Sequence, residues 1–388
     1  MSEKIIKTYK FRLYPSKAQV KTFEHWLDLC RELYNAALQE RRDAWRLNRV
    51  SVSFFDQSKQ FTEIRLVRED IAQLNSFVLR EQLKRIDKTF KAFFTRIKKG
   101  EKAGFPRFKN KSRFNSFTFS DLKGTRILDN KLLLSKIGKI KLKQHRNFDG
   151  KIKTVTIKRE IGKWFVFFAV ESEKEILPKT GNSVGVDVGL ENFAVLSNGE
   201  KIENPRFLRQ AEKRLKTAQR KLSRRKKGSN RRRRAVQLLA KQHLKIKNQR
   251  RDFLHKQSTD LIKRFDEIAV EDLKIQNLLK NIYLAKSISD AGWGTFFLML
   301  ESKAENAGRR VWKVAPHNTS QICSRCGEKA HKTLSVRLHS CLSCGLEMCR
   351  DENAAINIKA RIAPAGMLTD RKADEPRTFV DIALILSN

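Results

Sequence analysis

Residues 323–355 read CSRCGEKAHKTLSVRLHSCLSCGLEMCRDENAA, and two chemical signatures meet in this stretch. It holds two Cys-x-x-Cys pairs separated by fourteen residues, with cysteines at Cys323, Cys326, Cys341 and Cys344. Each pair can place two thiolates on one metal ion, and two pairs complete a tetrahedron. A glycine follows each pair, as tight turns favour. We therefore predict a zinc ribbon with a structural Zn²⁺ held by four sulfurs; the alternative is four unpaired buried thiols.

Three acids form the second signature. Asp351 follows the cysteines at once, Asp187 ends the strand-like run beginning at Val184, and Glu271 ends the run beginning at Ile268. Singly, Asp187 could be a turn cap and Asp351 a first-turn helix acid. Together, Asp187 and Glu271 would lie at the same ends of neighbouring strands in a βαβ-type sheet. Carboxylates that converge repel one another unless a cation intervenes, so we predict that the three acids bind Mg²⁺. Two such ions can activate water and stabilise a departing 3′-oxygen.

Two neighbouring acids are assigned other roles. Asp272 follows Glu271 directly, and strand alternation points it to the opposite side, so Glu271 is the predicted ligand. Asp290 is a possible auxiliary acid, but we expect it to cap the helix that follows it.

The composition implies a polyanionic partner. The chain has 388 residues, and Lys+Arg 83 against Asp+Glu 42 gives a formal net charge of +41. Nucleic acid is the leading candidate, and a ribosomal or general RNA-binding protein is the plainer alternative. The N-terminus lacks an apolar signal core, and the longest apolar run, residues 164–170, is too short to span a bilayer. We expect a soluble intracellular protein with no membrane partner, and cysteines kept reduced.

The first half of the chain predicts strands around a helical insertion. Residues 4–14 alternate as one strand, and from Lys17 to about Arg46 the apolar period is helical. A second helical region, residues 69–99, has an apolar face and a basic face that includes Lys84, Arg85, Lys88 and Lys91. Short alternating runs over residues 113–175 predict a small β-barrel or sheet, which the first strand could complete.

A new domain is expected from Ser183. Strands are predicted at residues 184–187, 193–196, 268–271 and 310–314, and helices at 293–307 and about 351–361. Residues 206–264 predict a helical hairpin. Its turn carries eight Lys or Arg in eleven residues: Arg224, Arg225, Lys226, Lys227, Arg231, Arg232, Arg233 and Arg234.

Two basic segments are predicted to contact nucleic acid. A charge run such as the hairpin turn is usually a solvated surface, but in this chain contact with backbone phosphates is the better interpretation. In the second segment Phe105, Phe108, Phe114, Phe117 and Phe119 interleave with Arg107, Lys109 and further basic residues. That arrangement suits base stacking with phosphate contact, although alternate phenylalanines can also be core.

Seven short motifs occur in order along nearly the whole chain: Tyr9-Lys10-Phe11-Arg12-Leu13-Tyr14-Pro15, Pro106-Arg107-Phe108-Lys109, Gly185-Val186-Asp187-Val188-Gly189, Val270-Glu271-Asp272-Leu273, Ser289-Asp290-Ala291-Gly292-Trp293, Thr319-Ser320-Gln321-x-Cys323-x-x-Cys326-Gly327 and Arg350-Asp351-x-Asn353-Ala354-Ala355-x-Asn357-Ile358. This ordered set resembles TnpB, the transposon-encoded RNA-guided nuclease family related to type V CRISPR effectors.

The resemblance implies a multidomain α/β fold: a RuvC (RNase H-like) nuclease domain with an inserted zinc ribbon, and an N-terminal wedge β-barrel carrying an inserted helical recognition domain. The implied boundaries are 1–15 for the first wedge strand, 16–104 for the recognition domain, 105–180 for the wedge barrel, 181–315 for the RuvC-like domain with the basic hairpin, 316–348 for the zinc ribbon, 349–364 for the last RuvC-like segment and 365–388 for a C-terminal tail.

The resemblance also implies a function. Asp187, Glu271 and Asp351 would be the catalytic, Mg²⁺-binding triad of an RNA-guided endonuclease. The partners would be a guide RNA derived from the transposon end and a double-stranded DNA target, recognised beside a short motif and cut on both strands. A monomeric ribonucleoprotein in a prokaryotic cytoplasm, near the nucleoid, is favoured. Cys349 departs from the Asp that commonly stands there, which could alter activity.

Two other functions fit part of the sequence. A guide-dependent repressor would bind DNA without cutting, but a protein that does not cut has no physical need for clustered acids. A basic zinc-ribbon RNA-binding protein would explain the charge and the cysteines but not the acids. Metal-dependent cleavage separates the nuclease from both, and programmability by RNA separates the repressor from the RNA-binding protein.

Overall fold

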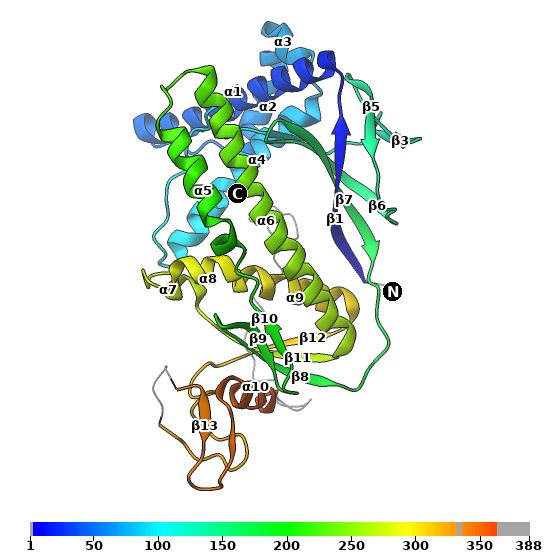
Figure 1. Ribbon diagram of the computed structural model, residues 1–388. Helices are drawn as coiled ribbons and strands as arrows, with labels where there is room; N and C mark the ends of the chain where they lie inside the picture. Colours follow the sequence, from blue (N-terminus) through cyan, green and yellow to red (C-terminus); the bar gives the residue numbers. More distant parts are fainter. Residues whose placement is uncertain (1–2, 332–335, 363–388) are drawn as a thin grey trace. The chain divides into compact units, whose positions relative to one another are not determined.

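The computed structural model describes residues 3–331 and 336–362, and this part of the chain divides into two compact units, residues 3–173 and 174–362 (Figure 1). The predicted tail, residues 365–388, lies outside the described residues, as do the last two residues of the segment 349–364. None of the described helices is long and apolar enough to cross a membrane.

The first unit is built on a seven-stranded antiparallel sheet of order β2-β6-β7-β1-β5-β4-β3. Its strands are β1 (Lys4–Tyr14), β2 (Ser116–Phe119), β3 (Arg126–Leu128), β4 (Lys131–Leu134), β5 (Gly138–Lys143), β6 (Lys151–Glu160) and β7 (Lys163–Glu173). The first strand lies between β7 and β5, which confirms that it completes the later strands. The sheet is a curled, open ladder rather than a closed barrel, because the short strands β2 and β3 are its two ends.

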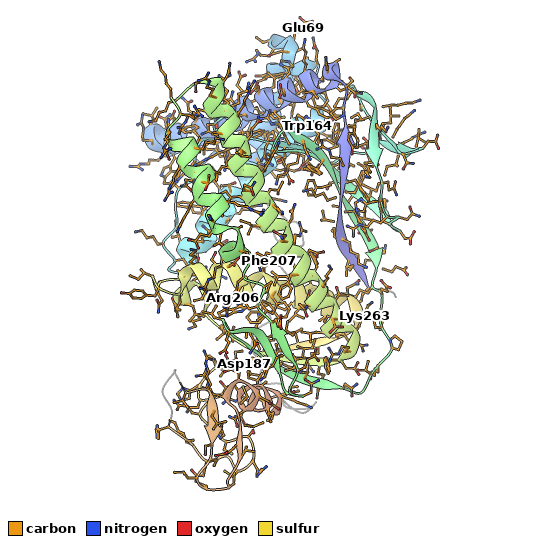
Figure 2. All side chains as sticks on the ribbon, viewed as in Figure 1. Glu69, Trp164, Asp187, Arg206, Phe207 and Lys263 are labelled. Atoms are coloured by element: carbon orange, nitrogen blue, oxygen red, sulfur yellow. The ribbon has the colours of Figure 1, made fainter. Side chains whose placement is uncertain are left out.

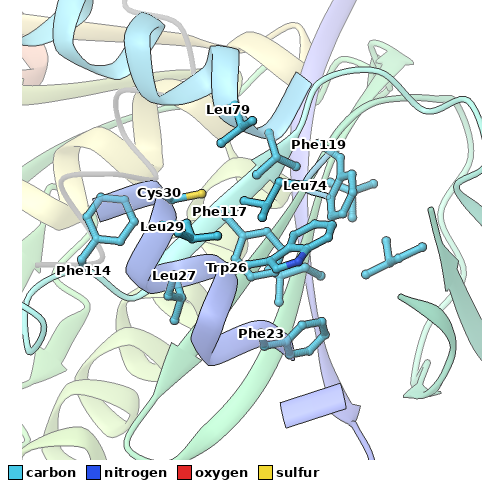
Figure 3. Close-up of a cluster of buried hydrophobic side chains, with 14 of the residues drawn as sticks. Phe23, Trp26, Leu27, Leu29, Cys30, Leu74, Leu79, Phe114, Phe117 and Phe119 are labelled. Atoms are coloured by element: carbon cyan, nitrogen blue, oxygen red, sulfur yellow. The ribbon is translucent and has the colours of Figure 1, made fainter. Parts of the chain in front are cut away.

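Four helices stand between β1 and β2 in the chain: α1 (Lys17–Asn48), α2 (Phe54–Val67), α3 (Glu69–Ala72) and α4 (Ser76–Lys98). A capping box formed by Ser16 and Gln19 begins α1. The buried face of α1 packs on the sheet, with the rings of Phe23 and Trp164 4.8 Å apart and those of Trp26 and Phe117 5.6 Å apart (Figure 3). Burying each such ring contributes about 1.5–3 kcal/mol, so this core holds helices and sheet together.

Several features of this unit differ from expectation. Helix α2 and the β3–β4 hairpin were not predicted, and the helical region 69–99 is interrupted between α3 and α4. Arg85, expected on a solvated basic face, is only partly exposed; its guanidinium donates to Ser116 Oγ at 3.0 Å and lies 5.3 Å from the centre of the Phe114 ring. Burial lowers the Arg85 pKa. Of the predicted basic face, Arg85 therefore packs against Ser116 and Phe114 within the unit.

The second unit contains a five-stranded sheet of order β10-β9-β8-β11-β12. The strands are β8 (Ser183–Val188), β9 (Asn192–Leu196), β10 (Lys201–Glu203), β11 (Glu267–Glu271) and β12 (Arg310–Val314). β8, β11 and β12 are parallel, while β9 is antiparallel to β8 and β10 to β9. The predicted parallel neighbours β8 and β11 are therefore confirmed.

Helices cover both faces of this sheet (Figure 1). The elements are α5 (Phe207–Ser223), α6 (Asn230–Arg264), α7 (Ile275–Leu278), α8 (Ala285–Ala291), α9 (Trp293–Ala307) and α10 (Arg350–Ala360). α6 and α9 share a core with one face, and α10 packs on the other. A Cβ at Gly185 would stand 2.0 Å from the Ala355 carbonyl oxygen, so only glycine allows α10 to lie this close to β8.

A small two-stranded sheet, β13 (Leu338–Ser340) and β14 (Glu347–Cys349), stands in the chain between β12 and α10. It carries the second cysteine pair. β14 runs directly into α10, so the cysteine segment and the helix that bears Asp351 are one continuous structure.

A candidate carboxylate centre beside a four-cysteine cluster

Strand alternation places the first two acids on one face of the sheet. Val184, Val186, Ile268 and Val270 point into the core shared with α6 and α9. The residues between them face the other way, toward α10, and Asp187 and Glu271 continue that second set. Asp351 lies in the first turn of α10. Asp187 and Glu271 therefore lie at the same end of β8 and β11, on the face that α10 covers, and Figure 2 labels Asp187 there.

The charges of the other two carboxylates act on Asp187. The pKa of Asp187 is raised well above its ordinary value, first by burial and then by the negative charges of Glu271 and Asp351. Only Arg350 acts in the opposite direction. A carboxylate in this position is costly to ionise without a nearby cation, which fits a site that binds positive charge.

Glu271 is held by Thr319, a motif residue that no local spacing links to this acid. Thr319 Oγ1 donates to Glu271 Oε1 at 2.6 Å. Burial raises the pKa of Glu271, while the Thr319 hydrogen bond and the charge of Arg361 lower it. Thr319 thus holds one carboxylate oxygen of Glu271 in place.

Asp351 is bound by two arginines. Arg350 approaches Asp351 Oδ1 at 3.2 Å through Nε and 3.1 Å through Nη2, and Arg337 Nη1 lies 3.6 Å from Oδ2. Arg337 also pairs with Glu191 at 3.3 Å. The two cations offset the negative charge of the cluster. Neither contact was predicted. Arg337 lies outside α10, so no local spacing signals it, and Arg350 is the immediate neighbour of Asp351 in α10, where adjacency alone does not indicate a contact.

The remaining acids and Cys349 have defined places. Asp272 is exposed, in agreement with its predicted opposite orientation. Asp290 does not cap the following helix, which corrects the expectation: its carboxylate accepts from the backbone N–H of Leu208 at 2.9 Å and pairs with Arg250 at 2.6 Å. It therefore caps α5, which no local pattern could reveal. Cys349 is the N-cap residue of α10 and makes no side-chain capping bond.

The four predicted cysteines form one cluster. Their sulfurs all lie within 4.8 Å of one another, with Cys323 and Cys344 3.6 Å apart and Cys326 and Cys341 3.5 Å apart. The glycines after each pair, Gly327 and Gly345, have φ of 79° and 69° and close tight turns. Hydrogen bonds, chiefly from the Cys344 N–H, lower the pKa of Cys341 to about 6, while burial and the neighbouring thiols raise the pKa values of Cys326 and Cys344. The donor set and spacing fit Zn²⁺.

Two asparagines on α10 tie the cysteine segment to the carboxylates. Asn353 is fully buried; it donates to the Ile322 carbonyl at 2.7 Å and accepts from the Ser324 N–H at 2.9 Å. One turn later, Asn357 donates to the carbonyls of Thr319 at 2.9 Å and Ile322 at 2.7 Å. The segment that supplies Cys323 thereby also positions Thr319 against Glu271.

The basic hairpin is present, with one internal exception. α5 and α6 pair along their length, and the predicted turn connects them. Arg224, Lys226, Lys227, Arg231, Arg233 and Arg234 are exposed at this tip. Arg232 instead donates to the carbonyls of Leu222 and Arg225, both at 3.0 Å, and so caps the end of α5. Arg225 is half-buried.

The second predicted contact segment divides into surface and core. Arg107 is exposed, whereas Lys109 is half-buried and its pKa is lowered, mainly by burial. Phe114, Phe117 and Phe119 are buried with Trp26 (Figure 3). For these three phenylalanines the core alternative is therefore confirmed, and base stacking is excluded. Phe105 and Phe108 are 47% and 46% exposed.

Three family profiles match parts of the chain. A family profile described as "Probable transposase" matches residues 167–282, and one described as "Cas12f1-like, TNB domain" matches residues 293–358. A third, described as "Helix-turn-helix domain", matches residues 1–49; the described part of that range forms β1 and the single helix α1.

Relatives match over nearly the whole chain. The chain is 33% identical over 368 residues to a Streptomyces pristinaespiralis protein named "Putative RNA-guided DNA endonuclease", covering 93% of this chain and 90% of that one. It is 29% identical over 380 residues to "Putative RNA-guided DNA endonuclease InsQ" of Escherichia coli (strain K12), covering 92% of each. It is also 23% identical to "TnpB-like protein L770" of Acanthamoeba polyphaga mimivirus, over 91% of this chain and 72% of that one.

A solved structure shares the fold. The Cas12f1 chain of a Cas12f1–sgRNA–target DNA complex superposes with a TM-score of 0.61 at 14% identity, covering 92% of this chain and 99% of that chain. By its fold, the protein is of the class that includes the Cas12f1 effector. By sequence, it belongs to the TnpB family, which confirms the resemblance drawn from its motifs.

Proposed function

We propose that this chain is the RNA-guided DNA endonuclease of a transposable element, cutting both strands of its target by metal-dependent phosphodiester hydrolysis. One observation carries the proposal: Asp187, Glu271 and Asp351 come from three separate elements and converge on one face of a sheet in a chain of net charge +41. A protein that only binds polyanions has no physical use for clustered negative charge, because it weakens attraction to phosphate.

The fold supports a RuvC-like assignment for residues 181–315 and 349–364. In the strand order β10-β9-β8-β11-β12, β8, β11 and β12 are parallel and β9 is antiparallel to both of its neighbours, so β9 is the one reversed strand, as in an RNase H-like sheet. The cysteine segment, residues 316–348, falls between β12 and α10, as expected of an inserted zinc ribbon. Residues 1–15 and 105–180 would be the wedge domain, and residues 16–104 the recognition domain.

The acids would hold Mg²⁺, and two ions there would supply an activated water and a positive charge for the departing 3′-oxygen. The chain's own residues prepare this site. Thr319 orients Glu271 through a 2.6 Å hydrogen bond, and Arg350 fixes Asp351. Arg337 offsets charge at the same carboxylate from outside α10.

The partners proposed are a guide RNA and double-stranded DNA. The exposed hairpin residues (Arg224, Lys226, Lys227, Arg231, Arg233 and Arg234) would contact backbone phosphates, together with Arg107 and the half-buried Lys109. Pairing with the guide would select the sequence, while the protein would recognise the backbone and a short motif beside the target. We propose a monomeric ribonucleoprotein acting in a prokaryotic cytoplasm.

The test is plasmid cleavage by the chain co-expressed with RNA from its flanking transposon end, using a library of motifs beside the target. We expect guide-dependent linearisation in Mg²⁺ and a loss of about a thousandfold or more in Asp187→Ala. Asp272→Ala is the matched control, because that neighbouring acid is exposed, and it should cut normally. Guide-dependent binding without cutting would instead establish a repressor, and binding of RNA without programmability a plain RNA-binding protein.

A further inference from the structure

Large apolar rings face outward from the end of α4 and from the segment that follows it. The side chains of Phe94, Phe105 and Phe108 are 54%, 47% and 46% exposed. Between the last two, Pro106 is buried and Arg107 is exposed. The segment therefore turns its small apolar residue inward and its two large rings outward, the reverse of what hydrophobic burial favours. We call Phe94, Phe105 and Phe108 the aromatic platform.

The platform is held rigidly. The Phe105 ring makes edge contacts with Phe90 and Phe93, with centroids 5.7 and 5.5 Å apart. The Arg42 guanidinium lies 5.2 Å from the centre of the Phe108 ring. Asn35 clamps the neighbouring backbone, accepting from the Lys109 N–H at 2.8 Å and donating to its carbonyl at 3.0 Å. The exposure of these rings is thus built into the fold and does not come from a loose loop.

The surroundings of the platform are strongly basic. Residues 88–113 contain ten Lys or Arg and a single acid, Glu101. Two of these cations are paired with acids outside the segment, Lys91 with Asp87 at 3.0 Å and Lys111 with Asp28 at 2.6 Å. Exposed cations remain on both sides of the rings, at Lys98, Lys99, Lys102 and Arg107. Exposed rings among such charges suit bases joined by phosphates.

We propose that the aromatic platform binds unpaired nucleotides by stacking, while the flanking cations contact their phosphates. In a duplex the faces of the bases are already covered, so the ligand is a single strand. It is either an unpaired part of the guide RNA or the DNA strand that is displaced when the guide pairs. The identity of these two strands rests on the proposed function. The proposal that the rings stack on unpaired bases does not.

The experiment measures binding by the full chain in EDTA, so that no cleavage takes place. Fluorescence anisotropy gives the affinity for a 20-nucleotide single-stranded RNA, a single-stranded DNA of the same sequence and the corresponding DNA duplex, from about 0.1 to about 1 M salt. Halogenated uracil in the single strands allows photo-crosslinking, and mass spectrometry then locates the crosslinked residues. The RNA and DNA arms identify the source of the strand.

The variants separate stacking from charge. In Phe105→Leu/Phe108→Leu we expect single-strand affinity to fall about tenfold at every salt concentration, without a change in salt slope, and duplex affinity to hold. Phe105→Trp/Phe108→Trp should restore binding, because the flat ring is kept. Lys98→Gln/Lys99→Gln/Lys102→Gln should lower the slope and leave the crosslinks in place. Phe55→Leu is the matched control, because that ring is 73% exposed elsewhere in the same unit.

Three results would overturn the proposal. The first is single-strand affinity unchanged in the Leu variant, and the second is an equal loss in Phe55→Leu. The third is a change of oligomeric state in the Leu variant with intact nucleic-acid binding, which would assign the rings to a protein contact. Guided cleavage is measured separately, so failure here leaves the nuclease proposal standing, and a failed cleavage test leaves the stacking result unaffected.

Discussion

At the scale of single residues, the buried Asp187 carboxylate lowers the stability of the folded state. Its pKa is raised by burial and by the charges of Glu271 and Asp351, so ionisation opposes folding once the pH exceeds the unfolded value near 3.8. We predict that Asp187→Asn raises Tm in EDTA at pH 7, by about 2–4 °C for each kcal/mol of penalty removed. Differential scanning calorimetry measures this directly.

The pH dependence has a defined sign. An acid with a raised folded pKa binds more protons in the native state, so stability falls as the pH rises through the unfolded value toward the folded one. The gain from Asp187→Asn should therefore vanish near pH 4 and grow toward neutrality. Mg²⁺ should stabilise the parent chain and not the variant. A variant less stable than the parent at pH 7 would show that the carboxylate is already compensated without metal.

At Gly185, the absence of a side chain allows α10 to pack closely on β8. A Cβ there would lie 2.0 Å from the Ala355 carbonyl oxygen and 2.6 Å from the Lys359 nitrogen, both in the backbone of α10. Backbone cannot move aside as a flexible side chain can. Gly185→Ala should therefore lower the free energy of unfolding by about 1–3 kcal/mol and displace α10 together with Asp351. Gly294→Ala is the control: its nearest atom would be 3.9 Å away, and it should be neutral. Urea unfolding and cleavage assays report both effects.

At the scale of elements, the link between the cysteine segment and α10 can be tested without removing metal. Asn353 is buried and satisfies both the Ile322 carbonyl and the Ser324 N–H. Asn353→Ala leaves the Ser324 N–H unpaired and the Ile322 carbonyl with Asn357 as its remaining side-chain donor, so we expect a loss of about 1–3 kcal/mol and weaker cleavage with zinc content unchanged. Zinc is measured by chelator release, and the exposed Asn198→Ala is the control. Loss of zinc in Asn353→Ala would instead mean that the contact supports the cluster itself.

Sequence periodicity predicted elements whose apolar pattern is strong. Residues 293–307 and 310–314 were expected as a helix and a strand, and α9 and β12 have those bounds. Helix α2 was missed because Phe55, Leu66 and Val67 point to solvent and give no apolar stripe. The acids could be predicted because strand alternation and parallel pairing are local rules with a fixed spatial result.

Contacts between residues distant in sequence could not be predicted in this way. Arg85 meets Ser116, Arg337 meets Asp351, and Asp290 meets the N-terminus of α5. Each depends on how elements pack, and no spacing within one element records it. The role of a single residue within a charge run could not be predicted for the same reason. Arg232 belongs to a basic run that was predicted to contact phosphates, but in the structure it caps α5.

At the scale of the whole molecule, a charge of +41 makes nonspecific attraction to nucleic acid certain, so the particular role of the hairpin must be read from salt dependence. Arg231→Gln/Arg233→Gln/Arg234→Gln removes three exposed charges at the tip. If each contacts a phosphate, the slope of log K against log salt should fall by about 2 for single-stranded RNA. Binding of the guide RNA across a salt series measures it.

Two controls define what the slope means. Arg232→Gln should lower Tm more than the slope, because that guanidinium bonds the carbonyls of Leu222 and Arg225 at the end of α5. Replacing the exposed Lys131, Lys139 and Lys141 of the β4–β5 hairpin by Gln removes equal charge from the other unit. An equal fall in slope there would show that the whole basic surface acts as one diffuse field. A fall confined to the tip variant would place guide RNA on the hairpin, since counterion release is counted only where phosphates are neutralised.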